Sequence, residues 1–150
     1  NVLSSVTNMP SNAVSQFFID YYIKHGGDPN AVIHNTPLIY ILVTGNDCYG
    51  KREAIMNVIS NPKFDVRGNQ PISNVYNHYL FYICERRDLV MLSTILKRDH
   101  VNVNVTNNRG ITLIEHMKSF VENPATKKII DILINYGSRT DNSSGLISIN

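Results

Sequence analysis

Four short polar segments recur along this chain at a constant spacing, and this periodicity constrains the fold more than any other feature. The segments Asp28-Pro29-Asn30, Asp65-Val66-Arg67, Asn102-Val103-Asn104 and Arg139-Thr140-Asp141 each begin 37 residues after the one before. A period of this size is typical of a supersecondary unit that is repeated and stacked, because one unit cannot bury its apolar face alone. Stacked repeats present an extended recognition surface in place of a catalytic cleft.

Length and charge exclude several classes of protein. The chain has 150 residues, of which 43% are hydrophobic, so it can build the core of one globular domain over residues 1–150. Its 14 basic and 12 acidic residues give a formal net charge of +2. This balance argues against nucleic acid or an anionic membrane as partner. The sequence also contains no apolar run of membrane-spanning length.

The residues that carry enzyme or metal chemistry do not form a motif. Cys48 and Cys84 are the two cysteines, and they lie too far apart for a CxxC site. The five histidines lack metal-ligand spacing, and no nucleophile, base and orienting acid occur together. We therefore expect no catalytic residue, no metal and no cofactor, and we expect Cys84 to be a structural core thiol. Reduced thiols favour a cytoplasmic location. The chain begins with Asn, which is typical of a fragment of a larger protein.

Apolar periodicity and capping residues predict short helices separated by turns. In the first helix the apolar stripe consists of Val14, Phe17, Phe18, Tyr21 and Tyr22. The expected helices cover about residues 11–24, 36–43, 51–59, 79–86, 89–96, 113–120 and 124–135.

Several local motifs lie in phase with the 37-residue period. They are His25–Ala31, Asn35–Leu38, Ile83–Val90, Gly110-Ile111-Thr112 and Ile132–Gly137. Together they resemble the ankyrin repeat, with its Gly-Ala-Asp segment, its Thr-Pro-Leu helix start and its Leu-Leu-x-x-Gly helix end. The resemblance covers residues 12–149. It implies an all-α solenoid of about four helix-turn-helix repeats with short hairpin-like turns, joined near residues 28, 65, 102 and 139.

The chain departs from the ankyrin pattern in its period, which is 37 where the family has about 33. The extra residues lie at 45–52, 68–77 and 119–125. In the third repeat, either Gln70-Pro71-Ile72 or His78-Tyr79-Leu80 can stand for the helix start, and the second keeps Ile83-Cys84 in register. Divergent repeats rich in Asn and Tyr are similar to those of intracellular bacterial effectors and host-range proteins of large DNA viruses. That similarity implies a host protein as partner and the host cytosol as location.

The stacked core is expected to contain the apolar residues that recur at helical spacing. These residues are Leu38, Ile41, Leu42, Ile55, Val58, Ile59, Leu80, Ile83, Cys84, Val90, Leu92, Ile95, Leu96, Ile114, Met117, Ile129, Ile130, Leu133 and Ile134.

The resemblance also implies where a partner protein would bind, at turn tips and on the short helices. The positions at the tips are Val32, Ile33, His34, Asn108, Arg109 and Ile111, and those on the short helices are Val43, Thr44, Glu85, Arg86, Ser119 and Phe120. Because Tyr, Arg and Phe are frequent interface residues, Tyr40, Arg86, Arg109 and Phe120 are the first candidates for anchors, followed by Tyr76 and Tyr79. For Tyr40, Phe81 and Tyr82 a core role is equally open.

These observations predict a protein–protein interaction module, and two alternatives stay open. In the first, the repeats are the substrate-targeting or regulatory arm of a larger enzyme or effector whose catalytic domain lies outside this sequence. In the second, the unusual loops dock the repeats onto another domain of the same chain.

Overall fold

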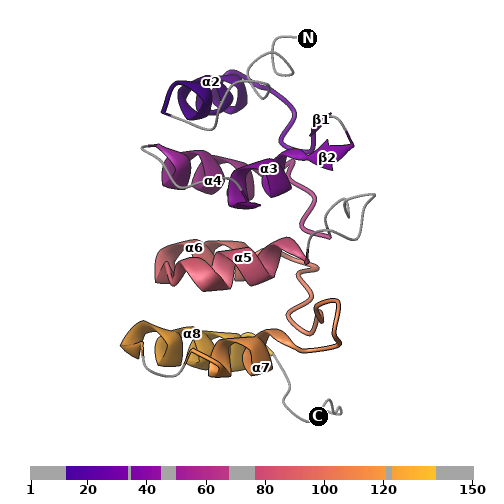
Figure 1. The fold of residues 1–150 in the computed structure, drawn as a ribbon. Helices are drawn as coiled ribbons and strands as arrows, with labels where there is room; N and C mark the ends of the chain where they lie inside the picture. The colour runs from indigo at the N-terminus through magenta and orange to yellow at the C-terminus, as the bar shows by residue number, and fades with distance from the viewer. Residues whose placement is uncertain (1–12, 34, 45–49, 68–76, 121–122, 138–150) are drawn as a thin grey trace. The chain divides into compact units, whose positions relative to one another are not determined.

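Short helices alternate with turns in the computed structural model, which describes residues 13–33, 35–44, 50–67, 77–120 and 123–137 (Figure 1). The helices are α2 (Ala13–Lys24), α3 (Leu38–Thr44), α4 (Lys51–Ile59), α5 (Tyr79–Arg86), α6 (Leu89–Leu96), α7 (Leu113–Lys118) and α8 (Pro124–Asn135). The strands β1 (Val32–Ile33) and β2 (Thr36–Pro37) form a small antiparallel hairpin. The chain is therefore mostly helical, as its periodicity predicts.

The chain divides into two compact units, residues 1–79 and 80–150. In the first unit α4 packs against both α2 and α3, and the β1–β2 hairpin adjoins the start of α3. In the second unit α8 packs against α6 and α7, so that the α5–α6 pair and the α7–α8 pair form successive layers (Figure 1). The single domain expected from the sequence stays a prediction.

The 37-residue period corresponds to a turn that is built in the same way each time. The side-chain oxygens of Asp28, Asp65 and Asn102 each accept a hydrogen bond from the backbone N–H two residues later, at 2.8, 3.0 and 2.9 Å. Short polar side chains favour this turn because they replace a backbone acceptor. The residue between donor and acceptor is buried in all three turns: Pro29, Val66 and Val103. The fourth segment, residues 139–141, lies outside the described residues.

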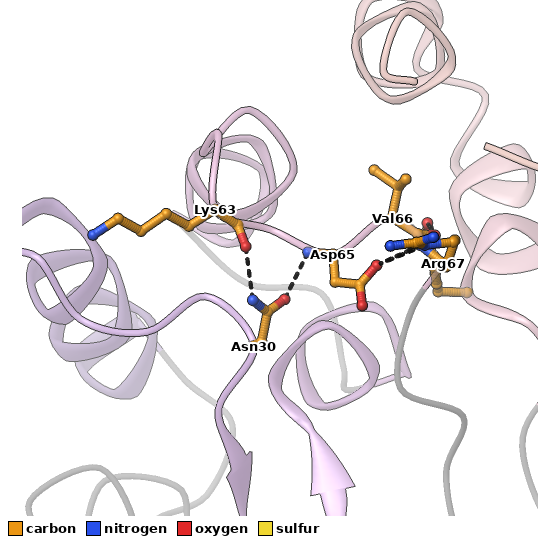
Figure 2. A network of polar contacts seen from close by, with 6 residues as sticks. Asn30, Lys63, Asp65, Val66 and Arg67 are labelled. Carbon is orange, nitrogen blue, oxygen red and sulfur yellow. Dashed lines mark hydrogen bonds and ion pairs between the residues drawn. The ribbon is translucent and has the colours of Figure 1, made fainter. Parts of the chain in front are cut away.

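In the first unit, the Asn30 side chain connects two of these turns (Figure 2). Its Nδ2 donates to the carbonyl oxygen of Lys63 at 2.7 Å, and its Oδ1 accepts from the backbone N–H of Asp65 at 2.7 Å. The Asp65 carboxylate in turn lies 3.6 Å from Nε of Arg67. The Asn30 side chain thus pairs with one backbone acceptor and one backbone donor of the next turn, as a neighbouring β-strand would.

Helix boundaries agree with the predicted ones to within two residues, and the differences have local causes. Helix α3 starts at Leu38 because Thr36 and Pro37 belong to β2. Helix α7 ends at Lys118, two residues before the predicted end, because the N–H groups of Ser119 and Phe120 bond to carbonyls three residues back. Helix α5 starts at Tyr79, which agrees with the register based on His78-Tyr79-Leu80.

Most of the predicted core is buried, but three apolar positions are not. Val90 and Ile134 were expected in the core, yet their exposed fractions are 59% and 49%, and Tyr21 of the predicted α2 stripe is 53% exposed. In α2 Ile19 and Ile23 are buried and Tyr22 is half-buried, while the side chains of Val14, Phe17 and Phe18 lie outside what the structure describes. Ile41 and Ile130 are half-buried. The error has one cause: successive helix residues differ by about 100° in direction, so a neighbour of a buried residue can face solvent.

The two sides of α6 provide a matched test of this packing. Leu92 is fully buried, so Leu92→Ala should lower the free energy of unfolding by about 2–5 kcal/mol. Val90→Ala, on the exposed side of the same helix, should change it by less than about 0.5 kcal/mol. Urea unfolding followed by circular dichroism measures both, and equal losses would contradict the described burial.

Asn30→Ala removes both hydrogen bonds that connect the first two turns. We expect it to lower the free energy of unfolding by about 1–3 kcal/mol, because a backbone donor and a backbone acceptor lose their partners. Asn30→Asp keeps the acceptor for Asp65 and loses the donor to Lys63, so its loss should be smaller. A variant Asn30→Ala as stable as the parent in urea would show that the connection contributes nothing.

Candidate functional site

Two turn tips have the hairpin-like form that the sequence predicts. At the first tip Val32 pairs with Pro37 and Ile33 with Thr36, which exposes Val32 and buries Ile33. At the second tip an isolated antiparallel bridge joins Thr106 and Thr112.

The Asn107 side chain stabilises the second tip, together with hydrogen bonds of its own backbone to Gly110 and Ile111. Oδ1 of Asn107 accepts from the backbone N–H groups of Arg109 and Ile111, at 2.9 and 3.0 Å. This arrangement leaves Asn108 and Arg109 exposed and Ile111 half-buried.

Several residues predicted to contact a partner prove to be core residues. Tyr40, Tyr79 and Ile33 are buried, so their side chains cannot anchor a partner, and we correct these predictions. The physical reason is that both tyrosine hydroxyls find partners inside the first unit. The Tyr40 hydroxyl accepts from the backbone N–H of Tyr79 at 3.2 Å, and the Tyr79 hydroxyl donates to the carbonyl of Val66. Their rings meet edge to face at 6.2 Å.

The remaining candidates on the short helices fall into three groups. Val43 and Phe81 are buried, and Thr44, Tyr82 and Arg86 are half-buried. Glu85, Ser119 and Phe120 are exposed. His34 and Tyr76 lie outside the described residues.

Two of the exposed candidates, Glu85 and Phe120, come together in the second unit, at the C-terminal ends of α5 and α7. We call the group around them the α5–α7 patch; it consists of Phe81, Glu85, Arg87, His116 and Phe120. Oε2 of Glu85 lies 2.7 Å from Nε2 of His116, which joins the two helices across 31 residues of sequence. The rings of Phe81 and Phe120 both meet the imidazole edge to face, at 5.4 and 5.3 Å.

Arg87 completes the patch from the joint between α5 and α6. Its guanidinium carbon lies 5.1 Å from the centre of the Phe120 ring, within range of a cation–π interaction. Its Nε donates to Oγ1 of Thr126 in α8 at 3.1 Å, and its Nη1 donates to the carbonyl of Glu85 at 3.2 Å. Phe120 nevertheless keeps 36% of its surface exposed. The patch therefore combines a histidine–carboxylate contact, an exposed aromatic ring and an arginine side chain on a preformed frame.

A capping box orients α7, the helix that carries His116. Oγ1 of Thr112 accepts from the backbone N–H of Glu115 at 3.2 Å, and the Glu115 carboxylate accepts from the backbone N–H of Thr112 at 3.1 Å. The hydrogen bonds from the Thr112 backbone and side chain hold the pKa of Glu115 below its ordinary value. They stabilise the first turn of a helix of only six residues.

Cys84, which precedes Glu85 in the chain, has the properties of a structural thiol. Cys84 is buried, and desolvation, with a further contribution from the negative charge of Glu85, raises its pKa to about 12. The thiol is thus protonated at neutral pH and behaves as a small apolar core group. In the described part of the chain, His, Cys, Asp and Glu side chains do not gather in groups of three or more that could hold a metal ion.

Sequence reasoning identified Glu85 and Phe120 but missed two members of the patch. His116 lies four residues before Phe120, and in the helix predicted over residues 113–120 this spacing puts both side chains on one face, so the signal was present. Arg87 was not among the candidate residues, and its neighbour Arg86 was preferred as an anchor. The sequence held no signal for Arg87, because its contacts with Phe120 and Thr126 depend on how α6, α7 and α8 pack.

Comparison with known proteins leaves the family open: no protein-family model, curated protein or solved structure matched the chain. None of the helices in the described segments has the length and apolar character that a bilayer-spanning helix needs.

The capping box predicts a pH dependence. Because the pKa of Glu115 is lowered in the folded state, its contribution to stability is present above the ordinary value of 4.5 and is lost as the pH falls through the folded pKa. The free energy of unfolding should therefore decrease more steeply below pH 4.5 in the parent than in Glu115→Gln, which keeps an acceptor and cannot titrate. Parallel pH profiles from urea unfolding would contradict the assignment.

Proposed function

We propose that this chain is a protein–protein interaction module of the ankyrin type, which binds a partner protein through its turn tips and its short helices. The observation that carries the proposal is the α5–α7 patch, where an exposed phenylalanine is stacked against an arginine and beside a histidine. Aromatic and arginine side chains are the groups that most often dominate binding energy at protein interfaces.

The repeated turn supports the ankyrin part of the proposal. The same side-chain hydrogen bond closes the turns at Asp28, Asp65 and Asn102, with a buried residue next in each. A helix pair follows each of the three turns, which begin at Asp28, Asp65 and Asn102. This order of turn, short helix and second helix is the order that the ankyrin resemblance implies, with its binding positions on the tips and on the concave helix face.

Preorganisation favours binding at the patch. Phe120 is held by contacts with Arg87 and His116, and His116 is held in turn by Glu85. Side chains that are already ordered lose little conformational entropy when a partner binds. The Cys84 thiol next to the patch is a poor nucleophile for catalysis, because it is buried and protonated.

A random peptide library displayed on phage tests the proposal without knowledge of the partner. Peptides enriched on the parent protein should bind Phe120→Ala at least about tenfold more weakly, because an exposed anchor at the centre of the patch is lost. Dissociation constants from fluorescence polarisation measure the change.

Tyr136→Ala provides the matched control, because Tyr136 has a similar exposed fraction of 40%. Tyr136 caps the far end of α8, about 15 Å along the helix from Thr126, where Arg87 binds. The control should leave peptide affinity unchanged. If Phe120→Ala keeps full affinity, or if both variants lose it equally, the patch is not the binding surface.

A further inference from the structure

Arg87 occupies a backbone conformation that suits glycine. Its φ is +56°, in the left-handed region where residues other than Gly are strained. The residue 37 positions earlier is Gly50, which directly precedes α4 and also has a positive φ, +87°. An arginine in this conformation is unfavourable for the backbone alone, and contacts of its side chain can offset that cost.

That side chain connects three segments of the second unit. It reaches the carbonyl of Glu85 at the end of α5, the ring of Phe120 after α7 and the hydroxyl of Thr126 in the first turn of α8. The Thr126 side chain is buried, so the guanidinium is fixed at one edge by a hydrogen bond while its carbon lies near the aromatic ring. A planar guanidinium held in this way is placed to attract and stack against the ring beside it.

We propose that Arg87 is a positioning residue that holds the Phe120 ring in one orientation on the α5–α7 patch. The part of this inference that concerns partner binding rests on the proposed function; the part that concerns the orientation of the ring does not. The competing explanation is a purely structural one, in which Arg87 only ties α5 to α8 through Thr126. The two differ in what they predict for the motion of the side chain at position 120.

The chain has no tryptophan, so Phe120→Trp introduces a single indole fluorophore at the patch. In this background, time-resolved anisotropy should show a small amplitude of fast local motion while Arg87 is present. Arg87→Gly should raise the amplitude of the nanosecond component about twofold, since an unrestrained side chain changes rotamer on that timescale. Because glycine relieves the left-handed strain, the melting temperature of this variant should fall little or rise.

His100→Gly is the matched control. His100 is exposed and also has a positive φ, +70°, so the substitution makes the same backbone change at another turn. It should leave the anisotropy of the introduced indole unchanged. If His100→Gly raises the fast component as much as Arg87→Gly does, the effect comes from the backbone and the proposal fails.

Arg87→Gln is the second variant, in case Arg87→Gly does not fold. Gln can still donate a hydrogen bond toward Thr126 but places no cation over the ring. Arg87→Gln should also raise the amplitude of the fast component. If either variant shows the same amplitude as the protein with Arg87, the proposal is overturned.

With phage-selected peptides, Arg87→Gly in the Phe120 parent should weaken binding about tenfold, as loss of preorganisation requires. If Phe120→Ala leaves affinity intact, the binding function fails while the anisotropy result still decides the role of Arg87.

Discussion

The turn that begins at Asp28, Asp65 and Asn102 is the constraint on which the rest of the structure depends. In each turn a side-chain oxygen takes the place of a backbone acceptor and fixes the chain direction within three residues. The next residue is thereby directed into the core, and the following helix starts from a defined position. Asn30 extends this control by binding the backbone of the next turn on both its donor and its acceptor side.

The α5–α7 patch is held in place by a helix cap and by contacts between side chains. The capping box of Thr112 and Glu115 stabilises the first turn of the six-residue helix α7, and His116 of that helix contacts Glu85. The rings of Phe81 and Phe120 contact the imidazole edge to face, and the Arg87 guanidinium lies over the Phe120 ring. Such an arrangement is consistent with the proposed recognition role, in which a rigid surface contributes affinity by limiting the entropy lost on binding.

The limits of prediction from sequence follow from the range of the interactions involved. Helix ends were predicted closely because caps and turns act within four residues, as Asn123 does when it accepts from the backbone N–H of Ala125. The buried face of a helix was predicted less well, and Val90 and Ile134 show how a shift of one residue changes core to surface. Tyr40 and Tyr79 were misplaced for another reason. A tyrosine can serve an interface or a core, and only the presence of a partner for its hydroxyl decides between them.

The sequence by itself determined the 37-residue period, the turns that produce it, the order of the helices and most of their ends. All of these arise from contacts between residues close together in the chain. The tertiary structure alone decided which tyrosines are buried and which side chains form the patch. Glu85 meets His116 across 31 residues, and Arg87 meets Thr126 across 39. Contacts of that range exist only once the helices have packed, because packing fixes the rotation of each helix and so the direction in which every side chain points.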